Sequence, residues 1–258
     1  MNRQPVIQPK FQNSQAMPTE QQRPTPRPEP LIRRDTNIIV NPFSSHYVDK
    51  SIVSFHYYNS FNYSLLADQK NDLHLTIGVT SANRGEGKTL TASNLAVSLT
   101  LGYQRKTVLV DLNLQVPRVH QVFGSPVGPG LSEALDGGGI HVSPTSIGNL
   151  SVLTAGYPPN GPADGRRKRG DTPLGVEQTA TFGAVIRALQ EEFDFIIVDM
   201  PAMSVRAFPI LFVNHLDGVF VVVEAGRTKR RDVEKMFQRL NKNQVLGFVF
   251  NRVKDDFE

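Results

Sequence analysis

The chain has 258 residues, a mass of 28.6 kDa, a formal net charge of +4, a pI of about 9.4 and no cysteine. This length fits one sizeable domain with appendages, and the missing cysteines exclude disulfides, thiolate nucleophiles and cysteine-based metal sites. The charge is too small to indicate a nucleic-acid partner. No apolar run approaches the roughly 18 residues of a membrane span, and the N-terminus lacks the apolar core of a secretory signal. We therefore expect a cytoplasmic protein without a transmembrane segment of its own.

The first 45 residues differ in composition from the rest of the chain. Prolines recur among glutamines from Pro5 to Pro30, which removes backbone N–H donors and supplies almost nothing to bury. We expect residues 1–45 to be a disordered Pro/Gln-rich arm and residues 46–258 to be one folded domain. Residues 23–30 favour polyproline II and could dock on an aromatic groove, but a solvated tether is the favoured interpretation.

Apolar runs of strand length alternate with helical stretches through the folded part of the chain. Strands are expected at 75–81, 107–112, 150–154, 193–200, 218–224 and 245–251, and helices at 88–101, 132–135, 180–192, 206–215 and 229–241. Because the strands are apolar on both faces, the pattern predicts a mostly parallel central sheet with helices on each side. The expected fold class is a three-layer α/β phosphate-loop fold, whose ligands bind beyond the carboxyl ends of the strands.

The first of these strands leads into the segment 82–89, Ala-Asn-Arg-Gly-Glu-Gly-Lys-Thr, and then into the first helix. This order is typical of a Walker A phosphate loop, although an alanine stands where the usual pattern has its first glycine. Gly85 and Gly87 let backbone N–H groups converge on phosphate oxygens at the helix N-terminus. Lys88 is expected to bridge the β- and γ-phosphates, and the Thr89 hydroxyl to bind Mg²⁺.

Two further apolar strands each end in an aspartate. Asp199 closes the run 195–199 as a Walker B residue does, which would supply a carboxylate to the magnesium shell. Asp111 closes the run 107–111 in the same way. An aspartate at a strand end is often only a helix cap or a turn residue. Beside a phosphate loop, we favour the metal-binding interpretation.

Several further motifs follow one another in a specific order. They are residues 111–117, His120, 123–124, 130–133, 149–150, 155–156, 158–160, 194–199 with Pro201, and 246–251. Together they resemble the bacterial tyrosine kinases, cytoplasmic domains that accompany capsule and exopolysaccharide synthesis. The resemblance covers about residues 55–253, nearly the whole globular part. Related ATPases of the chromosome-partitioning and division-site kind share the phosphate loop but explain the later motifs less readily.

The resemblance implies ATP and Mg²⁺ as cofactors and phosphoryl transfer to protein tyrosine as the activity. It places the nucleotide on Arg84, Gly85, Glu86, Gly87, Lys88, Thr89 and Leu90. It implies catalytic roles for Lys88, Asp111 and Asp199, and a metal site formed by Thr89, Asp111 and Asp199. Asn251 matches a position that contacts adenine in related ATPases, and an ordinary turn residue at a strand end is an equally weighted interpretation.

The same resemblance implies a membrane partner. In that family a polysaccharide co-polymerase, or chain-length regulator, activates the kinase through its cytoplasmic segment. A place at the inner face of the cell membrane and a homo-oligomer are both compatible with this arrangement. The polymer and the identity of the partner are not encoded in the motifs.

Three features depart from the family pattern. Asn113 and Gln115 stand where the second Walker motif of the family has its second aspartate and its arginine. A tyrosine hydroxyl, with a pKa of about 10, needs a base or a Lewis acid, and Asn113 cannot be that base. The tyrosine-rich tail has no counterpart after Tyr157. The charged positions that build a ring of subunits in the family are matched only by His56, Asn59 and Asn62. ATP binding is therefore better supported than tyrosine phosphorylation.

Two other functions stay open. One is a catalytically weak, nucleotide-dependent regulator of the co-polymerase, which the departures motivate. The other is a positioning ATPase. Such ATPases have a signature lysine early in the phosphate loop, and this chain has Asn83 and Arg84 there instead, which argues against this function. Outside the motifs, a tyrosine cluster between Tyr47 and Tyr63 is expected to pack on a helix, and the basic run 166–169 is expected to be a solvated loop.

Overall fold

The computed structural model describes residues 32–34, 74–157, 174–175, 177–206 and 208–252. All of them belong to one unit of the chain, Leu31–Glu258. Most of the Pro/Gln-rich arm, the tyrosine cluster, the subunit-contact positions 56, 59 and 62, and the basic run 166–169 lie outside the described residues. Among the described helices, none has the length and apolar character needed to cross a membrane.

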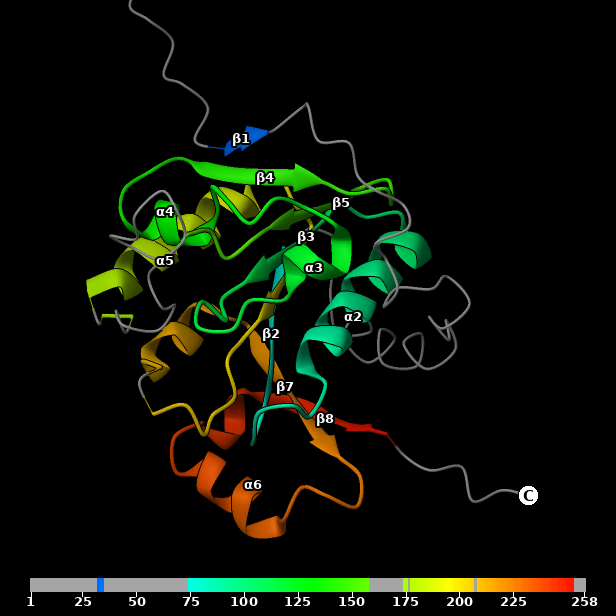
Figure 1. The fold of residues 1–258 in the computed structure, drawn as a ribbon, viewed down its shortest axis with the longest axis vertical. Coiled ribbons are helices and arrows are strands. Elements are labelled where there is room, and N and C mark those ends of the chain that lie inside the picture. The colour runs from blue at the N-terminus through cyan, green and yellow to red at the C-terminus, as the bar shows by residue number, and fades with distance from the viewer. Residues whose placement is uncertain (1–31, 35–73, 158–173, 176, 207, 253–258) are drawn as a thin grey trace, which may run out of the picture. The chain divides into compact units, whose positions relative to one another are not determined.

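A single sheet of eight strands runs through the described part of this unit. The strands are β1 (Ile32–Arg34), β2 (Leu75–Ser81), β3 (Thr107–Asp111), β4 (Ile140–Pro144), β5 (Leu150–Leu153), β6 (Phe195–Asp199), β7 (Gly218–Glu224) and β8 (Val245–Asn251). Their spatial order is β1-β4-β5-β3-β6-β2-β7-β8, and every neighbouring pair is parallel except the antiparallel pair β4–β5. The expected mostly parallel α/β sheet is confirmed (Figure 1).

Helical segments connect the strands. They are α2 (Lys88–Tyr103), α3 (Val119–Phe123), α4 (Leu131–Leu135), α5 (Glu177–Gln190), η1 (Ile210–His215), α6 (Arg230–Phe237) and η2 (Lys242–Gln244). The helix expected at 206–215 is only the 3₁₀ segment η1, because Pro209 precedes it and restricts the residue before itself. The helix expected at 229–241 ends at Phe237 and gives way to η2.

Alternating side chains of the central strands fill two cores, one on each face of the sheet. Ile77, Leu109 and Ile197 pack under α2 on one face. Val108 and Ile196, which point the opposite way, belong to the core beneath α4, α5 and η1. Figure 1 shows α2 and α5 on opposite sides of the central strands. This two-sided burial explains why these strands read as unbroken apolar runs rather than as alternating patterns.

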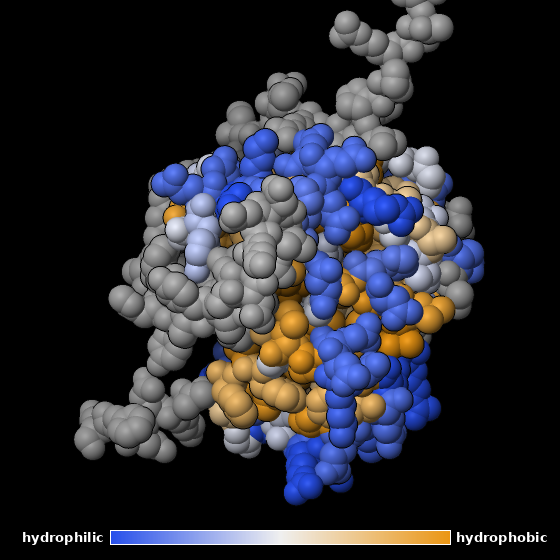
Figure 2. All heavy atoms as spheres, turned by 180° about the vertical axis from the view of Figure 1, so that it is seen from behind, coloured by the Kyte–Doolittle hydropathy of each residue, from blue (hydrophilic) through white to orange (hydrophobic). Residues whose placement is uncertain are grey.

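The edge strand β8 has a different pattern. Leu246, Phe248 and Phe250 are exposed, whereas the residues between them are half-buried. The lower half of Figure 2, at the height of β7 and β8 in Figure 1, shows apolar side chains at the surface. An edge strand has only one strand neighbour, so its outward row of side chains stays accessible.

The aromatic side chains of the α5 core give a stability prediction. Phe182 is fully buried and packs on Phe212, with ring centroids 5.0 Å apart. We expect Phe182→Ala to lower the free energy of unfolding by roughly 3–5 kcal/mol in urea denaturation, because it opens a cavity in a packed core. The matched control is Phe250→Ala, at a ring that is 67% exposed, which should change the stability by less than about 0.5 kcal/mol. Equal losses in the two variants would contradict this assignment of the core.

Candidate functional site

The loop between β2 and α2 has the backbone that its glycines suggest. Gly85 and Gly87 have φ angles of 86° and 97°, in the left-handed region that side chains with a Cβ rarely adopt. Helix α2 begins at Lys88, without a side-chain cap and without an acidic residue in its first turn. Its first N–H groups are therefore available to an anion, and the helix dipole favours negative charge there.

The tip of β6 meets this loop through a hydrogen bond. Thr89 Oγ1 donates to Asp199 Oδ2 over 2.6 Å. The second oxygen, Asp199 Oδ1, is buried and has no hydrogen-bond partner among the described residues. A hydroxyl beside a carboxylate with a spare oxygen suits Mg²⁺, which prefers oxygen ligands and takes the rest of its shell from water and phosphate. The residues present therefore fit a magnesium ion.

Asp111 occupies the same level on the neighbouring strand, since Asp111 and Asp199 are register partners of β3 and β6. Its oxygens accept three backbone N–H groups: that of Asn113 at 3.1 Å, and those of Arg118 and Val119 at 3.1 Å each. The latter two residues start helix α3, so Asp111 holds the N-terminus of this helix against β3. Asp111 thus shapes the loop that follows it in addition to carrying charge.

Both buried carboxyls have raised pKa values. Burial, and then the charge of Asp199, raise the pKa of Asp111 to about 8, although the three N–H groups lower it in part. Burial raises the pKa of Asp199 to about 6, against the opposing effects of the Lys88 charge and the Thr89 hydrogen bond. Two acids this close, without a cation between them, cannot both ionise easily. The two carboxyl groups therefore favour binding of a cation, which would stabilise their ionised forms.

Asn251, at the end of β8, braces the phosphate loop. Its Nδ2 donates to the carbonyl oxygen of Glu86 at 2.9 Å, and its Oδ1 accepts from the backbone N–H of Arg252 at 3.0 Å. A Cβ at Gly87 would lie 2.0 Å from this Nδ2, so only glycine fits there. The structure thus gives Asn251 a contact with the loop backbone that neither the adenine nor the turn interpretation contained.

Glu86 is buried and fully engaged by hydrogen bonds. Glu86 is 3% exposed, and its carboxylate accepts from the backbone N–H of Asn83 at 2.9 Å and from the Thr228 hydroxyl at 2.5 Å. Thr228 lies in the connection between β7 and α6. Glu86 therefore ties the phosphate loop to that connection, a contact 142 residues apart in sequence that no local pattern signals.

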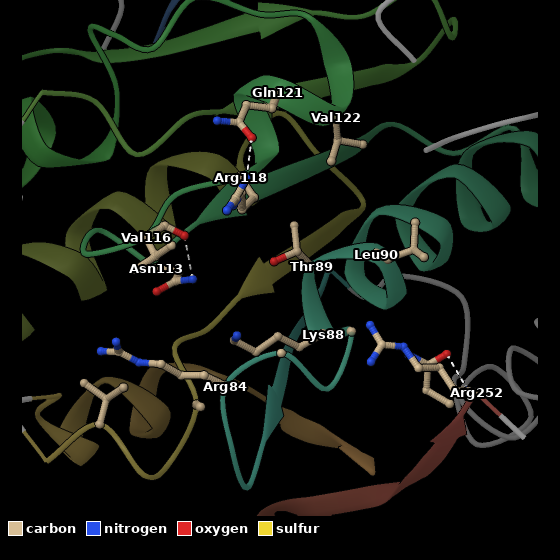
Figure 3. A pocket seen from close by; sticks show the side chains of 15 residues that line it. Arg84, Lys88, Thr89, Leu90, Asn113, Val116, Arg118, Gln121, Val122 and Arg252 are labelled. Carbon is tan, nitrogen blue, oxygen red and sulfur yellow. Dashed lines mark hydrogen bonds between the residues drawn. The ribbon is translucent and has the colours of Figure 1, made fainter. Parts of the chain in front are cut away.

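A pocket of about 570 Å³ opens beside the loop. Its walls are formed by Arg84, Gly85, Gly87, Lys88, Thr89, Leu90, Asn113, Val116, Arg118, Gln121, Val122, Ala202, Val205, Asn251 and Arg252. Figure 3 shows Arg84 and Lys88 extending towards the Asn113 side of the pocket, and Leu90 and Arg252 at the other side. Glu86, Asp111 and Asp199 are not among the lining residues.

The structure thus brings the expected loop residues together but puts three of the expected acidic side chains behind the wall. The sequence did not identify the wall contributed by α3, nor Ala202, Val205 and Arg252. The place of Arg252 in the pocket could have been predicted, because it directly follows Asn251, which was an expected site residue. Asn113 faces the pocket and donates from Nδ2 to the carbonyl oxygen of Val116 at 2.9 Å.

The chain is similar in sequence and in fold to proteins that are already known. Tyrosine-protein kinase CpsD of Streptococcus pneumoniae serotype 4 is 32% identical over 207 residues, which cover 76% of this chain and 83% of CpsD. Among solved structures, the chimerical protein CapA2B2 has a TM-score of 0.62 and 24% identity, covering 76% of this chain and 83% of its own. The septum site-determining protein MinD of Pyrococcus horikoshii, solved with Mg-ADP, has a TM-score of 0.52 and 22% identity, with 68% and 69% covered. No protein-family model matches the chain.

The raised pKa values give a pH prediction for the nucleotide-free protein. An unfolded aspartate releases its proton near pH 4, whereas folded Asp199 and Asp111 keep theirs to about pH 6 and 8. Because the folded state binds more protons in this window, its stability falls as the pH rises from about 4 to about 8. Asp199→Asn removes one of these acids. We expect it to reduce the loss of unfolding free energy between pH 5 and pH 8 by roughly 1.4 kcal/mol in urea denaturation without Mg²⁺.

The control for this measurement is Glu234→Gln, which removes an acidic group whose side chain is 60% exposed on α6. It should leave the pH dependence as in the unmodified chain. If Asp199→Asn and Glu234→Gln have the same pH dependence, burial of Asp199 does not govern this part of the stability.

Proposed function

The chain belongs to the bacterial tyrosine-protein kinases, and we propose that it binds ATP with Mg²⁺ and transfers a phosphoryl group to protein tyrosine in capsule or exopolysaccharide production. The observation that carries the proposal is the contact of Thr89 with Asp199 beside Lys88 at the start of α2. Lys88 and Thr89 start α2, whereas Asp199 ends β6, so the fold brings together two segments that are 110 residues apart in sequence.

Each residue of the loop has a distinct task in this proposal. Lys88, 8% exposed, is held at the first turn of α2, where its charge can neutralise a phosphate oxygen. The backbone N–H groups around Gly85 and Gly87 would donate hydrogen bonds to further phosphate oxygens. Thr89 and Asp199 would hold Mg²⁺, which withdraws negative charge from the transferred phosphoryl group when it is bound. Catalysis would come mainly from positioning and from charge neutralisation.

Asp111 would serve as the second acidic residue of the metal site, from the neighbouring strand β3. Its oxygens are engaged by three N–H groups, so its main task would be to hold the 113–119 loop that walls the pocket and to supply negative charge. At neutral pH its raised pKa favours the protonated form until a cation arrives. Binding of Mg²⁺ would therefore lower that pKa and restore the carboxylate.

A second function is favoured by one observation. Neither Asp111, with its three N–H partners, nor Asn113, an amide bonded to Val116, is a free base for a tyrosine hydroxyl. The chain would then act as a nucleotide-dependent regulator of a polysaccharide co-polymerase, with slow turnover. A positioning ATPase is supported by the MinD-like fold alone.

The wider organisation belongs to the same proposal. Residues 1–45, of which Ile32–Arg34 pair with β4 as strand β1, would tether the phosphate-loop domain, 46–258, near a membrane partner of the co-polymerase class. The chain would work at the inner face of the cell membrane, with its partner supplying the membrane-spanning part. This organisation is proposed from the family resemblance, because the relatives are named only as tyrosine-protein kinases.

Phosphotyrosine content tests the kinase assignment. We expect mass spectrometry of the protein, expressed with its membrane partner, to find phosphotyrosine on one of the two. Lys88→Ala should abolish the signal, because it removes the charge that binds the phosphates. The control Lys106→Ala, at an exposed position before β3, should keep it. Absence of phosphotyrosine on both proteins would rule out the kinase and leave the regulator.

The regulator has its own test, a pull-down of the membrane partner by the unmodified chain and by Lys88→Ala, each with Mg²⁺ and ATP. A nucleotide-dependent switch requires that Lys88→Ala lose partner binding together with ATP binding, because the nucleotide shifts the affinity between the two proteins. An intact complex with Lys88→Ala would contradict the switch.

A further inference from the structure

Arg84 occupies a special place in the pocket wall. It belongs to the phosphate loop itself, one residue before Gly85, and its side chain extends towards the same end of the pocket as Lys88 (Figure 3). Its Nη2 donates to Gln115 Oε1 over 3.0 Å. Gln115 lies in the loop after β3, whereas Arg84 lies in the loop after β2. Because β6 stands between β3 and β2, this hydrogen bond joins the two loops that flank Asp199 at the tip of β6.

The other two arginines of the wall have partners of their own. Arg252 forms an ion pair with Glu224, with Nη1 and Oε1 2.9 Å apart. Arg118 also donates to a neutral amide, Gln121, at 2.9 Å, but it lies just before α3 and outside the phosphate loop. Among the described residues, Arg84 has no carboxylate within ion-pair distance, and its hydrogen bond to Gln115 engages a neutral amide. A guanidinium has five N–H donors in a planar fork, so most of them stay available.

The negative charge of ATP explains why a second cation, the Arg84 guanidinium, would be useful beside Lys88. A triphosphate with one Mg²⁺ keeps a net negative charge, of which Lys88 neutralises only a part. A guanidinium binds phosphate oxygens with charge-assisted hydrogen bonds, and its planar fork suits two oxygens at once. Holding that fork through an amide oxygen, rather than through a carboxylate, orients it without neutralising its charge.

We propose that Arg84 is a second phosphate-binding cation of this site, oriented by Gln115, and that it contacts the terminal phosphate of ATP. The proposal rests on the proposed function, since it presumes that the pocket binds ATP. It makes Gln115 a positioning residue and gives the loop a contact that ADP, without a terminal phosphate, cannot form. The site would thereby distinguish ATP from ADP.

Nucleotide affinity tests this without requiring turnover. The probes are ADP and the β,γ-imido analogue of ATP, each with Mg²⁺, titrated into the full chain by calorimetry. We expect Arg84→Ala to weaken binding of the imido analogue by roughly 10- to 100-fold and binding of ADP by less than about twofold. Arg230→Ala, at an α6 side chain that is 93% exposed and does not line the pocket, removes the same charge and should change neither affinity.

A second-site change tests the geometry. Since the Gln115 amide lies within hydrogen-bond distance of the Arg84 guanidinium, an arginine side chain from position 115 can reach the same place. We expect Gln115→Arg, added to Arg84→Ala, to restore most of the preference for the triphosphate. An unchanged preference in Arg84→Ala, an equal loss for both nucleotides, or a lost preference that Gln115→Arg fails to restore would overturn the proposal. If the unmodified chain bound neither nucleotide, the proposed function itself would fail.

Discussion

The hydrogen bond from Thr89 to Asp199 joins the phosphate loop to the centre of the sheet, and the rest of the site is arranged around it. It can form only because β6 lies directly beside β2, where the parallel register sets Val79 opposite Asp199, although Thr89 and Asp199 are 110 residues apart in sequence. Asn251 and Glu86 then fix the loop from the other side. The loop is thus held at both ends before any ligand arrives, which reduces the ordering cost of binding.

The same arrangement buries two carboxyl groups, and ionising them costs free energy. Asp111 and Asp199 are fully buried at neighbouring strand ends, and their raised pKa values show that the folded chain holds them as ionised groups only at a cost. A cation held by Thr89 and Asp199 would reduce that cost. Ligand binding and stability are therefore linked, since whatever binds the folded state alone also stabilises it. This coupling of binding to stability is expected both for a kinase and for a nucleotide-dependent regulator. The two functions differ in whether a base is available to deprotonate the tyrosine hydroxyl.

The sequence was sufficient for the parts of the structure that depend on local patterns. The runs 75–81, 218–224 and 245–251 form strands with those bounds, and the loop before Lys88 has the expected glycine backbone. Strand β4 and helix α3 were missed, because each is only five residues long and is stabilised by tertiary contacts. The Arg84 contact with Gln115 and the Asn251 contact with Glu86 were also beyond prediction, since they join segments 31 and 165 residues apart. The hydrophobic periodicity of a sequence carries no information about contacts between such distant residues.

The magnesium dependence of nucleotide affinity tests most directly whether Thr89 and Asp199 hold the metal. The measurement is calorimetric titration of ADP into the unmodified chain and into Asp199→Asn, with Mg²⁺ and with EDTA. The account predicts that Mg²⁺ tightens binding at least roughly tenfold in the unmodified chain, and that Asp199→Asn still binds ADP but loses most of this gain. An equal gain from Mg²⁺ in both proteins would contradict it, because the metal would then be held elsewhere.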